Sequence, residues 1–283
     1  MLRNLLTITT LALLLSGCAS TTGLFFYPRA VWIETPADHG FVYKDVDLTA
    51  ADGTSLHAWW IPAQQPRGTI LFLHGNAENI SSHTRSVYWL VEAGFNVLAL
   101  DYRGFGASAG HALMPSVLQD VRAAADWIRA EQPQAPFWLL GQSMGAALAL
   151  DFAGMYADQY ALAGVVVDAP FTGFPAIARD ALSHSLLGWL VMPLTLLVPG
   201  HWDPIDYVSQ IQAPVMVIHS ATDKVIPRAH GQALYRVLSQ RSDQTTCWLE
   251  SRGRHIETFR FAGLKTATLD FLQTGVCPAF TGD

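Results

Sequence analysis

The fold of this chain is indicated most clearly by the stretch Phe137-Trp-Leu-Leu-Gly-Gln-Ser-Met-Gly-Ala-Ala-Leu-Ala-Leu-Asp-Phe-Ala153. The apolar run 137–140 has the length of a buried strand, and the Ala/Leu-rich run 146–153 favours a helix. Gly141-Gln-Ser-Met-Gly145 joins them, so the chain must turn sharply at Ser143. This pattern is typical of a nucleophile elbow, whose flanking glycines relieve crowding. We expect the Ser143 hydroxyl to lie at the helix N-terminus, where free N–H groups and the helix dipole favour negative charge.

These five residues could also form an ordinary glycine/serine turn, so the rest of the chain must decide between the two interpretations. Short apolar runs alternate with longer helical patterns, which predicts an α/β fold with a mostly parallel sheet covered on both faces. Strands are expected at 45–49 and 54–61, joined by the turn Asp52-Gly53, and at 69–73, 95–100, 137–140, 164–167, 215–219 and 246–250. Helices are expected at 82–93, 115–131, 144–156, 229–239 and 258–273. The long interruption 171–212 is interpreted as a small helical cap over the carboxyl edge of the sheet.

A serine hydroxyl is a poor nucleophile at neutral pH and needs a base, a task that suits imidazole. Asp223 follows the strand that ends at His219, and His255 follows the strand that ends near Glu250. The acid would fix the tautomer of the imidazole and stabilise its charged form. The chain order Ser143, Asp223, His255 is the order found in α/β-hydrolases.

Three other residues compete for the acid and base roles. Asp168 ends its strand and is an alternative acid, although we expect it to shape the junction with the cap. His219 ends a buried strand and His230 lies in a helix, so we expect both to be structural.

His74-Gly75-Asn76 directly follows the first parallel strand. Acyl transfer passes through a tetrahedral oxyanion, which needs one N–H donor after the nucleophile and one from this loop. The backbone N–H groups of Asn76 and Met144 are therefore the expected oxyanion donors. His74 has no partner at metal-ligand spacing, so we expect a loop-orienting role and predict no metal and no organic cofactor.

These motifs occur together with several others in a fixed order. The matching segments are Leu71-Phe-Leu-His-Gly-Asn-Ala-Glu-Asn-Ile80, Asp101-Tyr-Arg-Gly-Phe-Gly106, 141–145, Pro170-Phe-Thr172 and the segments around Asp223 and His255. In this order they resemble the serine hydrolases of the α/β-hydrolase superfamily, above all the membrane-associated group whose eukaryotic members include protein depalmitoylases. The resemblance covers roughly 46–271 and implies a serine esterase or thioesterase with the triad Ser143, Asp223 and His255. Two residues depart from the family pattern, Ser220 and Arg254, which stand where glycine is usual.

The beginning of the chain predicts where the protein works. Residues 1–17 carry Arg3 and an apolar run from Leu5 to Leu15, which indicates a secretory signal too short to span a bilayer. Leu15-Ser-Gly-Cys18 resembles the lipobox of bacterial lipoproteins, so we expect Cys18 to be lipidated and to anchor a domain at 45–283 through a tether at 18–44. The alternative is an ordinary signal cleaved near Ala19. With no aspartate after the cysteine, a Gram-negative source would direct the protein to the outer membrane, facing the periplasm.

Charge and cysteine content narrow the partners further. Without the signal and its single Arg3, 266 residues remain with 16 basic and 23 acidic side chains, a formal charge of −7. Nucleic acid is therefore an unexpected partner, and a small-molecule or acyl ester is the expected substrate. Cys247 and Cys277 form an even pair in an oxidising compartment, which leaves a disulfide or two free thiols open.

The sequence is also compatible with other functions. Gly104-Phe-Gly-Ala-Ser-Ala109 fits a dinucleotide fingerprint, but the acid expected about twenty residues later is only Asp120 or Asp126, both in a helical pattern. A peptidase or amidase could use the same triad, and a non-catalytic lipoprotein binding module could keep the fold. The apolar cap residues 186–198 could line an acyl pocket or touch a membrane, although we expect them to be core under the cap.

Overall fold

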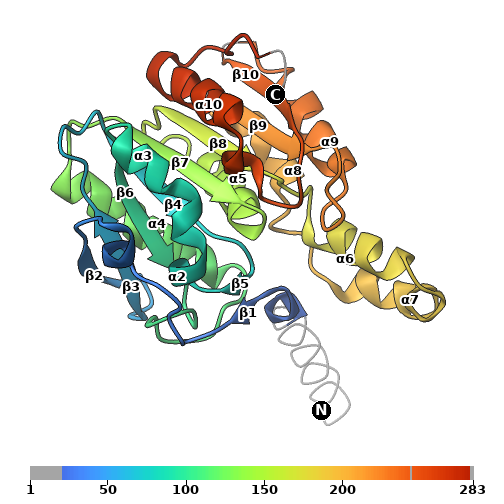
Figure 1. Cartoon of the computed structure of the whole chain (residues 1–283). Helices are drawn as coiled ribbons and strands as arrows, with labels where there is room; N and C mark the ends of the chain where they lie inside the picture. Colours follow the sequence, from blue (N-terminus) through green and yellow to red (C-terminus); the bar gives the residue numbers. More distant parts are fainter. Residues whose placement is uncertain (1–20, 243, 281–283) are drawn as a thin grey trace.

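A central sheet of eight strands carries the fold in the computed structural model, which describes residues 21–242 and 244–280 (Figure 1). In spatial order the strands are β10 (Thr246–Ser251), β9 (Val215–Ser220), β8 (Gly164–Asp168), β7 (Phe137–Gln142), β4 (Thr69–Leu73), β6 (Asn96–Asp101), β3 (Ser55–Ile61) and β2 (Lys44–Thr49). β3 runs antiparallel to both of its neighbours, and the other five pairs are parallel. The predicted mostly parallel α/β sheet, with its opening hairpin, is confirmed.

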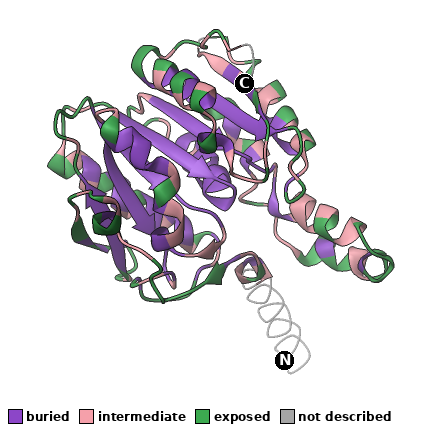
Figure 2. Cartoon of the chain, viewed as in Figure 1, coloured by how far each residue is buried: buried purple, intermediate pink, exposed green. Residues whose placement is uncertain are grey.

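Helices cover both faces of the sheet, so the central strands are buried on both sides and are continuous apolar runs (Figure 2). One face packs against α4 (Ser116–Glu131), α5 (Met144–Met155) and α9 (Arg228–Leu238). The other face packs against α3 (Tyr88–Glu92) and α10 (Ala262–Thr274). Two apolar cores therefore hold the sheet rigid, and with it the loops at its carboxyl edge.

Two expected helices differ in the structure, one by interruption and one by a later start. The helix expected at 82–93 is divided into α2 (Ile80–His83), the 3-10 turn η3 (Thr84–Val87) and α3. The Thr84 hydroxyl donates to the Ile80 carbonyl at 2.6 Å, and such side-chain bonds compete with regular helix geometry. The helix expected at 258–273 begins only at Ala262, because the 3-10 turn η6 (Thr258–Arg260) precedes it.

The insertion at 171–212 is helical, and its first part projects from the sheet (Figure 1). It contains α6 (Phe174–Ser183), α7 (Leu186–Val191), the 3-10 turn η4 (Met192–Leu197), α8 (Pro204–Tyr207) and the 3-10 turn η5 (Val208–Gln210). The expectation that its apolar residues form core is wrong for most of them. The side chains of Leu186, Leu187, Trp189, Leu190, Leu194, Leu196 and Leu197 are exposed. Because the α6–α7 pair projects from the sheet, the other described elements do not cover these side chains.

The segment expected to be a tether packs on the domain from Thr21 onward. It forms the 3-10 turns η1 (Thr21–Phe25) and η2 (Pro36–His39) and the short strand β1 (Tyr27–Pro28), which pairs with β5 (Ala77–Glu78). The expected signal, 1–17, and the expected lipidation site, Cys18, lie outside the described residues. Within 21–242 and 244–280, no helix has the length and apolarity needed to cross a bilayer.

A disulfide joins the carboxyl-terminal tail to the last strand. Cys247 of β10 is bonded to Cys277, which follows α10, with the Cα atoms 5.3 Å apart. The bond closes a loop with a sequence separation of 30 residues. By the chain-entropy relation, a loop of that size stabilises a fold by roughly 3 to 4 kcal/mol.

Candidate active site

Ser143 stands at the sharp turn between β7 and α5. Its backbone has φ 56° and ψ −116°, a conformation that non-glycine residues rarely adopt. A Cβ atom at Gly141 would overlap the carbonyl of Gly145, and a Cβ at Gly145 would overlap the carbonyl of Leu73. The two flanking glycines are thus required by close backbone contacts, and the turn places Ser143 directly before the first residue of α5.

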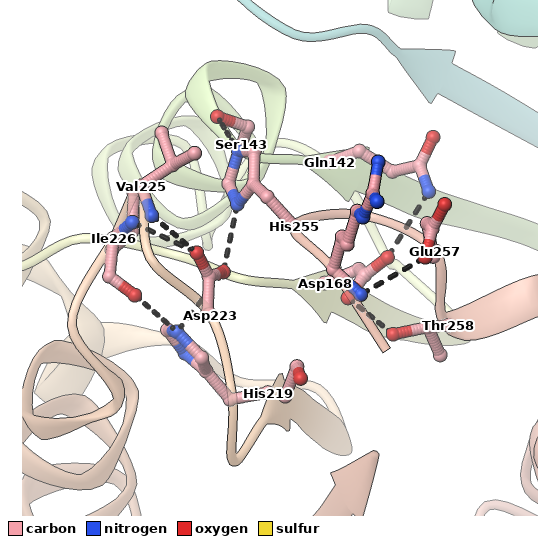
Figure 3. Close-up of polar contacts among 12 residues, drawn as sticks. Gln142, Ser143, Asp168, His219, Asp223, Val225, Ile226, His255, Glu257 and Thr258 are labelled. Carbon is pink, nitrogen blue, oxygen red and sulfur yellow. Dashed lines mark hydrogen bonds and ion pairs between the residues drawn. The ribbon is translucent and has the colours of Figure 1, made fainter. Parts of the chain in front are cut away.

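His255 lies between Ser143 and Asp223 (Figure 3). Its Nε2 atom is 2.9 Å from Ser143 Oγ, and its Nδ1 atom is 2.7 Å from Asp223 Oδ2. The structure therefore brings together the three side chains that the sequence analysis selected. They come from the ends of β7, β9 and β10, three strands that reach the same edge of the parallel sheet.

The Asp223 carboxylate is shielded from solvent and well supplied with donors. Its Oδ1 accepts hydrogen bonds from the N–H groups of Val225 at 2.8 Å and Ile226 at 3.0 Å. Burial raises the pKa of Asp223, but the bond with His255 and these two N–H groups outweigh burial and hold the pKa below its ordinary value. A charged Asp223 can orient the His255 ring and stabilise its protonated form.

Asp168, the alternative acid, is engaged elsewhere. Its Oδ1 accepts from the Thr258 hydroxyl at 2.7 Å, and its Oδ2 accepts from Gln142 Nε2 at 3.1 Å (Figure 3). Burial raises the pKa of this carboxyl to about 6, although both bonds oppose the shift. Thr258 is three residues after His255, so Asp168 holds the base of that loop. The sequence did not indicate Thr258 or Gln142, whose only signals were their closeness to His255 and Ser143 in the chain.

The two alternative bases contact groups other than Ser143 and Asp168. His219 Nε2 is 3.0 Å from the Ile226 carbonyl oxygen, which fixes the loop that carries Asp223. His230 Nε2 is 2.6 Å from Asp180 Oδ2 in the cap helix α6, and its Nδ1 is 2.8 Å from Thr172 Oγ1. His230 therefore links α9 to the base of the cap.

The proposed oxyanion loop is held from both sides. The Tyr102 hydroxyl donates to the His74 carbonyl at 2.9 Å, and the Tyr27 N–H donates to the Asn76 carbonyl at 2.7 Å. His74 is fully buried with its Nδ1 2.7 Å from the Gly75 carbonyl, a loop-orienting contact. Burial, with a contribution from His83, lowers the pKa of His74 well below its ordinary value. Asn76 and Met144 both line the cavity that contains Ser143.

That cavity has a volume of about 420 Å³ and an apolar lining. It is bounded by η1, by the cap and by the loop after β9, and none of its lining residues is Asp, Glu, Lys or Arg. The sequence did not predict that Leu24, Phe25 and Tyr27 contribute to it, since their segment was interpreted as a tether. In the described ranges, no group of three His, Cys, Asp or Glu side chains is arranged to hold a metal ion.

The Gly104–Ala109 segment forms a closed turn beside the site, with the Gly104 N–H donating to the Ala109 carbonyl. Asp120, the nearest acid to the position that a dinucleotide fingerprint requires, instead binds Arg103 Nε at 2.9 Å inside the domain. Arg103 also contacts Asp52 at 2.7 Å. The acid therefore serves an internal ion pair, and the dinucleotide interpretation has no support from this loop.

Comparison with known proteins agrees with this geometry. A family model described as serine aminopeptidase, S33, matches residues 64–204. The chain is 32% identical to the protein YfhR of Salmonella typhi over 271 residues, which cover 89% of this chain and 88% of that protein. It is 29% identical over 242 residues to the α/β hydrolase domain-containing protein WAV2 of Arabidopsis thaliana, covering 81% of this chain and 77% of that protein. The solved esterase Pf2001 of Pyrococcus furiosus has a TM-score of 0.72 at 24% identity, covering 88% of this chain and 97% of its own. The chain belongs to the α/β-hydrolase superfamily.

Proposed function

We propose that this protein is a membrane-tethered serine hydrolase that cleaves carboxylic esters or thioesters of apolar acyl groups. The observation that carries the proposal is the chain of contacts from Ser143 through His255 to Asp223, at the wall of an uncharged cavity. The fold it shares with an enzyme described as an esterase adds support. No cofactor is needed for this chemistry.

The contacts support a two-step reaction. His255 Nε2 takes the proton of Ser143 Oγ as this oxygen attacks the acyl carbon, and the N–H groups of Asn76 and Met144 stabilise the oxyanion. The carbon–oxygen or carbon–sulfur bond then breaks, and His255 returns the proton to the leaving alcohol or thiol. Water, deprotonated by His255, hydrolyses the acyl-Ser143 intermediate and restores the free hydroxyl.

A peptidase with the same triad is the second candidate, favoured by the description of the matching family. An aminopeptidase must bind the ammonium group at the start of its substrate, which calls for a carboxylate near the scissile bond. The cavity lining contains no Asp or Glu. We therefore favour ester or thioester substrates over peptides with a free amino terminus.

Labelling with a fluorophosphonate probe tests the nucleophile. The wild-type chain should label, and Ser143→Ala and His255→Ala should not. If the wild type fails to label, the protein is better described as a binding module on a hydrolase fold; if Ser143→Ala still labels, another residue is the nucleophile. A chain-length panel of p-nitrophenyl esters, with an acyl-thioester and an aminoacyl amide, then identifies the bond and acyl group preferred.

The tether is part of the proposal and has its own test. We propose lipidation of Cys18 and a place in the bacterial cell envelope, on the strength of the lipobox-like Leu15-Ser-Gly-Cys18. Metabolic labelling with an alkynyl fatty acid should mark the wild-type chain and not Cys18→Ala. Equal labelling of the two chains would remove Cys18 from the proposal.

A further inference from the structure

The end of the cap carries an exposed apolar surface, which we call the cap tip. It comprises the seven exposed side chains of α7 and η4, which are Leu186, Leu187, Trp189, Leu190, Leu194, Leu196 and Leu197. Their exposed fractions run from 57% to 92%, and the α7 end of the cap is coloured largely as exposed in Figure 2. From 181 to 202 the sequence contains no Asp, Glu, Lys or Arg. A contiguous apolar patch without charge marks a binding surface.

Polar groups within the cap tip are satisfied by the cap itself. Trp189 Nε1 donates to the Ser183 carbonyl at 3.1 Å, and the Gly188 N–H donates to Ser185 Oγ at 3.0 Å. The Thr195 hydroxyl donates to the Met192 carbonyl at 2.8 Å. Internal hydrogen bonds of this kind lower the cost of moving a surface into an apolar medium.

The beginning of the described chain lies beside the cap tip. The Thr21 hydroxyl donates to the Leu197 carbonyl at 3.4 Å, and the Phe25 ring packs edge-on against Phe174 of α6, with centroids 5.2 Å apart. Cys18 precedes Thr21 by three residues, which can span at most about 10 Å. A lipid on Cys18, or the apolar run before it, would thus attach to the membrane close to the cap tip.

The cap tip is continuous with the rim of the cavity. Leu194, Leu24 and Val225 are exposed, at 59%, 72% and 62%, and all three also line the cavity that contains Ser143. An apolar path therefore runs from the outer surface of the cap to the Ser143 hydroxyl.

We infer that the cap tip docks in the interface of a lipid bilayer, so that the cavity receives acyl esters directly from the membrane. The lack of charge fits the acyl boundary of a neutral bilayer, and aromatic and leucine side chains suit that depth. The position of the chain's beginning selects a bilayer over a second copy of the chain as the occupant. The substrate part of this inference rests on the proposed ester hydrolysis, and the choice of a bilayer as the occupant rests in part on the proposed tether.

Docking can be tested with the full chain in phosphatidylcholine vesicles. Leu190→Cys and Val42→Cys, labelled with an environment-sensitive fluorophore, form a matched pair because both native side chains are 78% exposed. The parent chain treated with the same label provides the blank. The label at 190 should shift to the blue and be quenched by lipids with a spin label on the acyl chain, and the label at 42 should do neither.

Two results would overturn the docking inference. One is an equal response of both labels, which would mean that proximity to the vesicle is sufficient. The other is a response at 190 that follows protein concentration and not lipid, which would identify a second copy of the chain as the occupant.

The substrate part is tested by combining Leu186→Ser with Leu190→Ser, neither of which lines the cavity. Hydrolysis of a long-chain ester dissolved in vesicles should fall roughly tenfold as apolar contact with the bilayer is lost. Hydrolysis of a soluble short-chain ester should stay unchanged, as should both activities in Val42→Ser. Equal loss on both substrates would contradict membrane delivery. If the wild type cleaves no ester at all, the proposed function fails, and the vesicle labelling still decides the docking.

Discussion

Two carboxylates stand at the ends of adjacent parallel strands and have opposite electrostatic surroundings. Asp168 ends β8, and Asp223 follows β9, which pairs with β8. Asp223 accepts from two backbone N–H groups and contacts His255, and its pKa is lowered. Asp168 has a neutral hydroxyl and a neutral amide as donors, and burial raises its pKa to about 6. The donors around each acid, and not its position on the edge, therefore decide which one can serve a charged imidazole.

The largest effect is expected at Asp223. Asp223→Asn keeps the shape of the side chain but removes the charge and permits the wrong His255 tautomer, so kcat for an ester substrate should fall by roughly 10⁴-fold. Because the substrate cavity is untouched, KM should change little. The measurement is steady-state kinetics on the soluble ester that the wild type cleaves best.

Substitution of Asp168, alone and together with Asp223→Asn, tests whether Asp168 can replace Asp223. Asp168→Asn alone should lower kcat by less than about tenfold, since its contacts reach His255 only through Thr258. The double variant Asp168→Asn/Asp223→Asn should have a kcat that is less than about tenfold below that of Asp223→Asn. A loss at Asp168→Asn as large as that at Asp223→Asn would reverse the assignment of the two acids.

The second effect is on stability, where the two acids should have opposite pH dependence. The pKa of Asp168 is raised from 3.8 to about 6 in the folded state, so its contribution to stability is complete below pH 3.8. This contribution is lost as the pH rises through 6. The loss amounts to about 3 kcal/mol. Asp223, with its lowered pKa, stabilises the fold above its unfolded value of 3.8 and loses this as the pH falls through the folded value.

Urea unfolding of the wild type and Asp168→Asn between pH 4 and pH 7 measures this difference. The free energy of unfolding of Asp168→Asn, relative to the wild type, should rise by about 2 kcal/mol between pH 4 and pH 7, which is most of the full difference. Asn can still accept from Gln142 and donate to Thr258 Oγ1, so the hydrogen bonds are kept. Parallel curves for the two proteins would show that folding does not raise the pKa of Asp168.

The same contrast explains how far the sequence could predict this site. Strand ends follow from apolar runs, and parallel strands end at one edge, so Ser143, Asp223 and His255 could be placed near one another. Whether a strand-end acid faces a histidine or a threonine depends on loop conformation, which no periodicity encodes. For this reason Asp168 could only be named as a rival, and its link to Thr258 was not foreseen.

The cap and the beginning of the chain show a second limit. Apolar content predicts burial, yet the cap residues around Leu190 are exposed, because a short helical insertion has too few elements to cover both its sides. Conversely, the segment after Thr21 was interpreted as a tether, but Phe26 is buried in the core and Tyr27 pairs with the loop after β4. Composition alone does not predict which of two apolar segments is buried against other elements of the fold.

The smallest effect is expected at Thr258, the link between Asp168 and the His255 loop. Thr258→Val removes the donor to Asp168 Oδ1 with little change of shape, which should cost about 1 to 3 kcal/mol of stability and lower kcat by only a few-fold. Thr268→Val is a matched control, because Thr268 is also buried but donates to the Leu264 carbonyl within α10. It should lose stability without losing activity. Thr258→Ser, which restores the hydroxyl, should recover kcat, a result that a merely structural role would not produce. An equal loss of kcat in Thr258→Val and Thr268→Val would show that the Asp168–Thr258 bond has no part in placing His255.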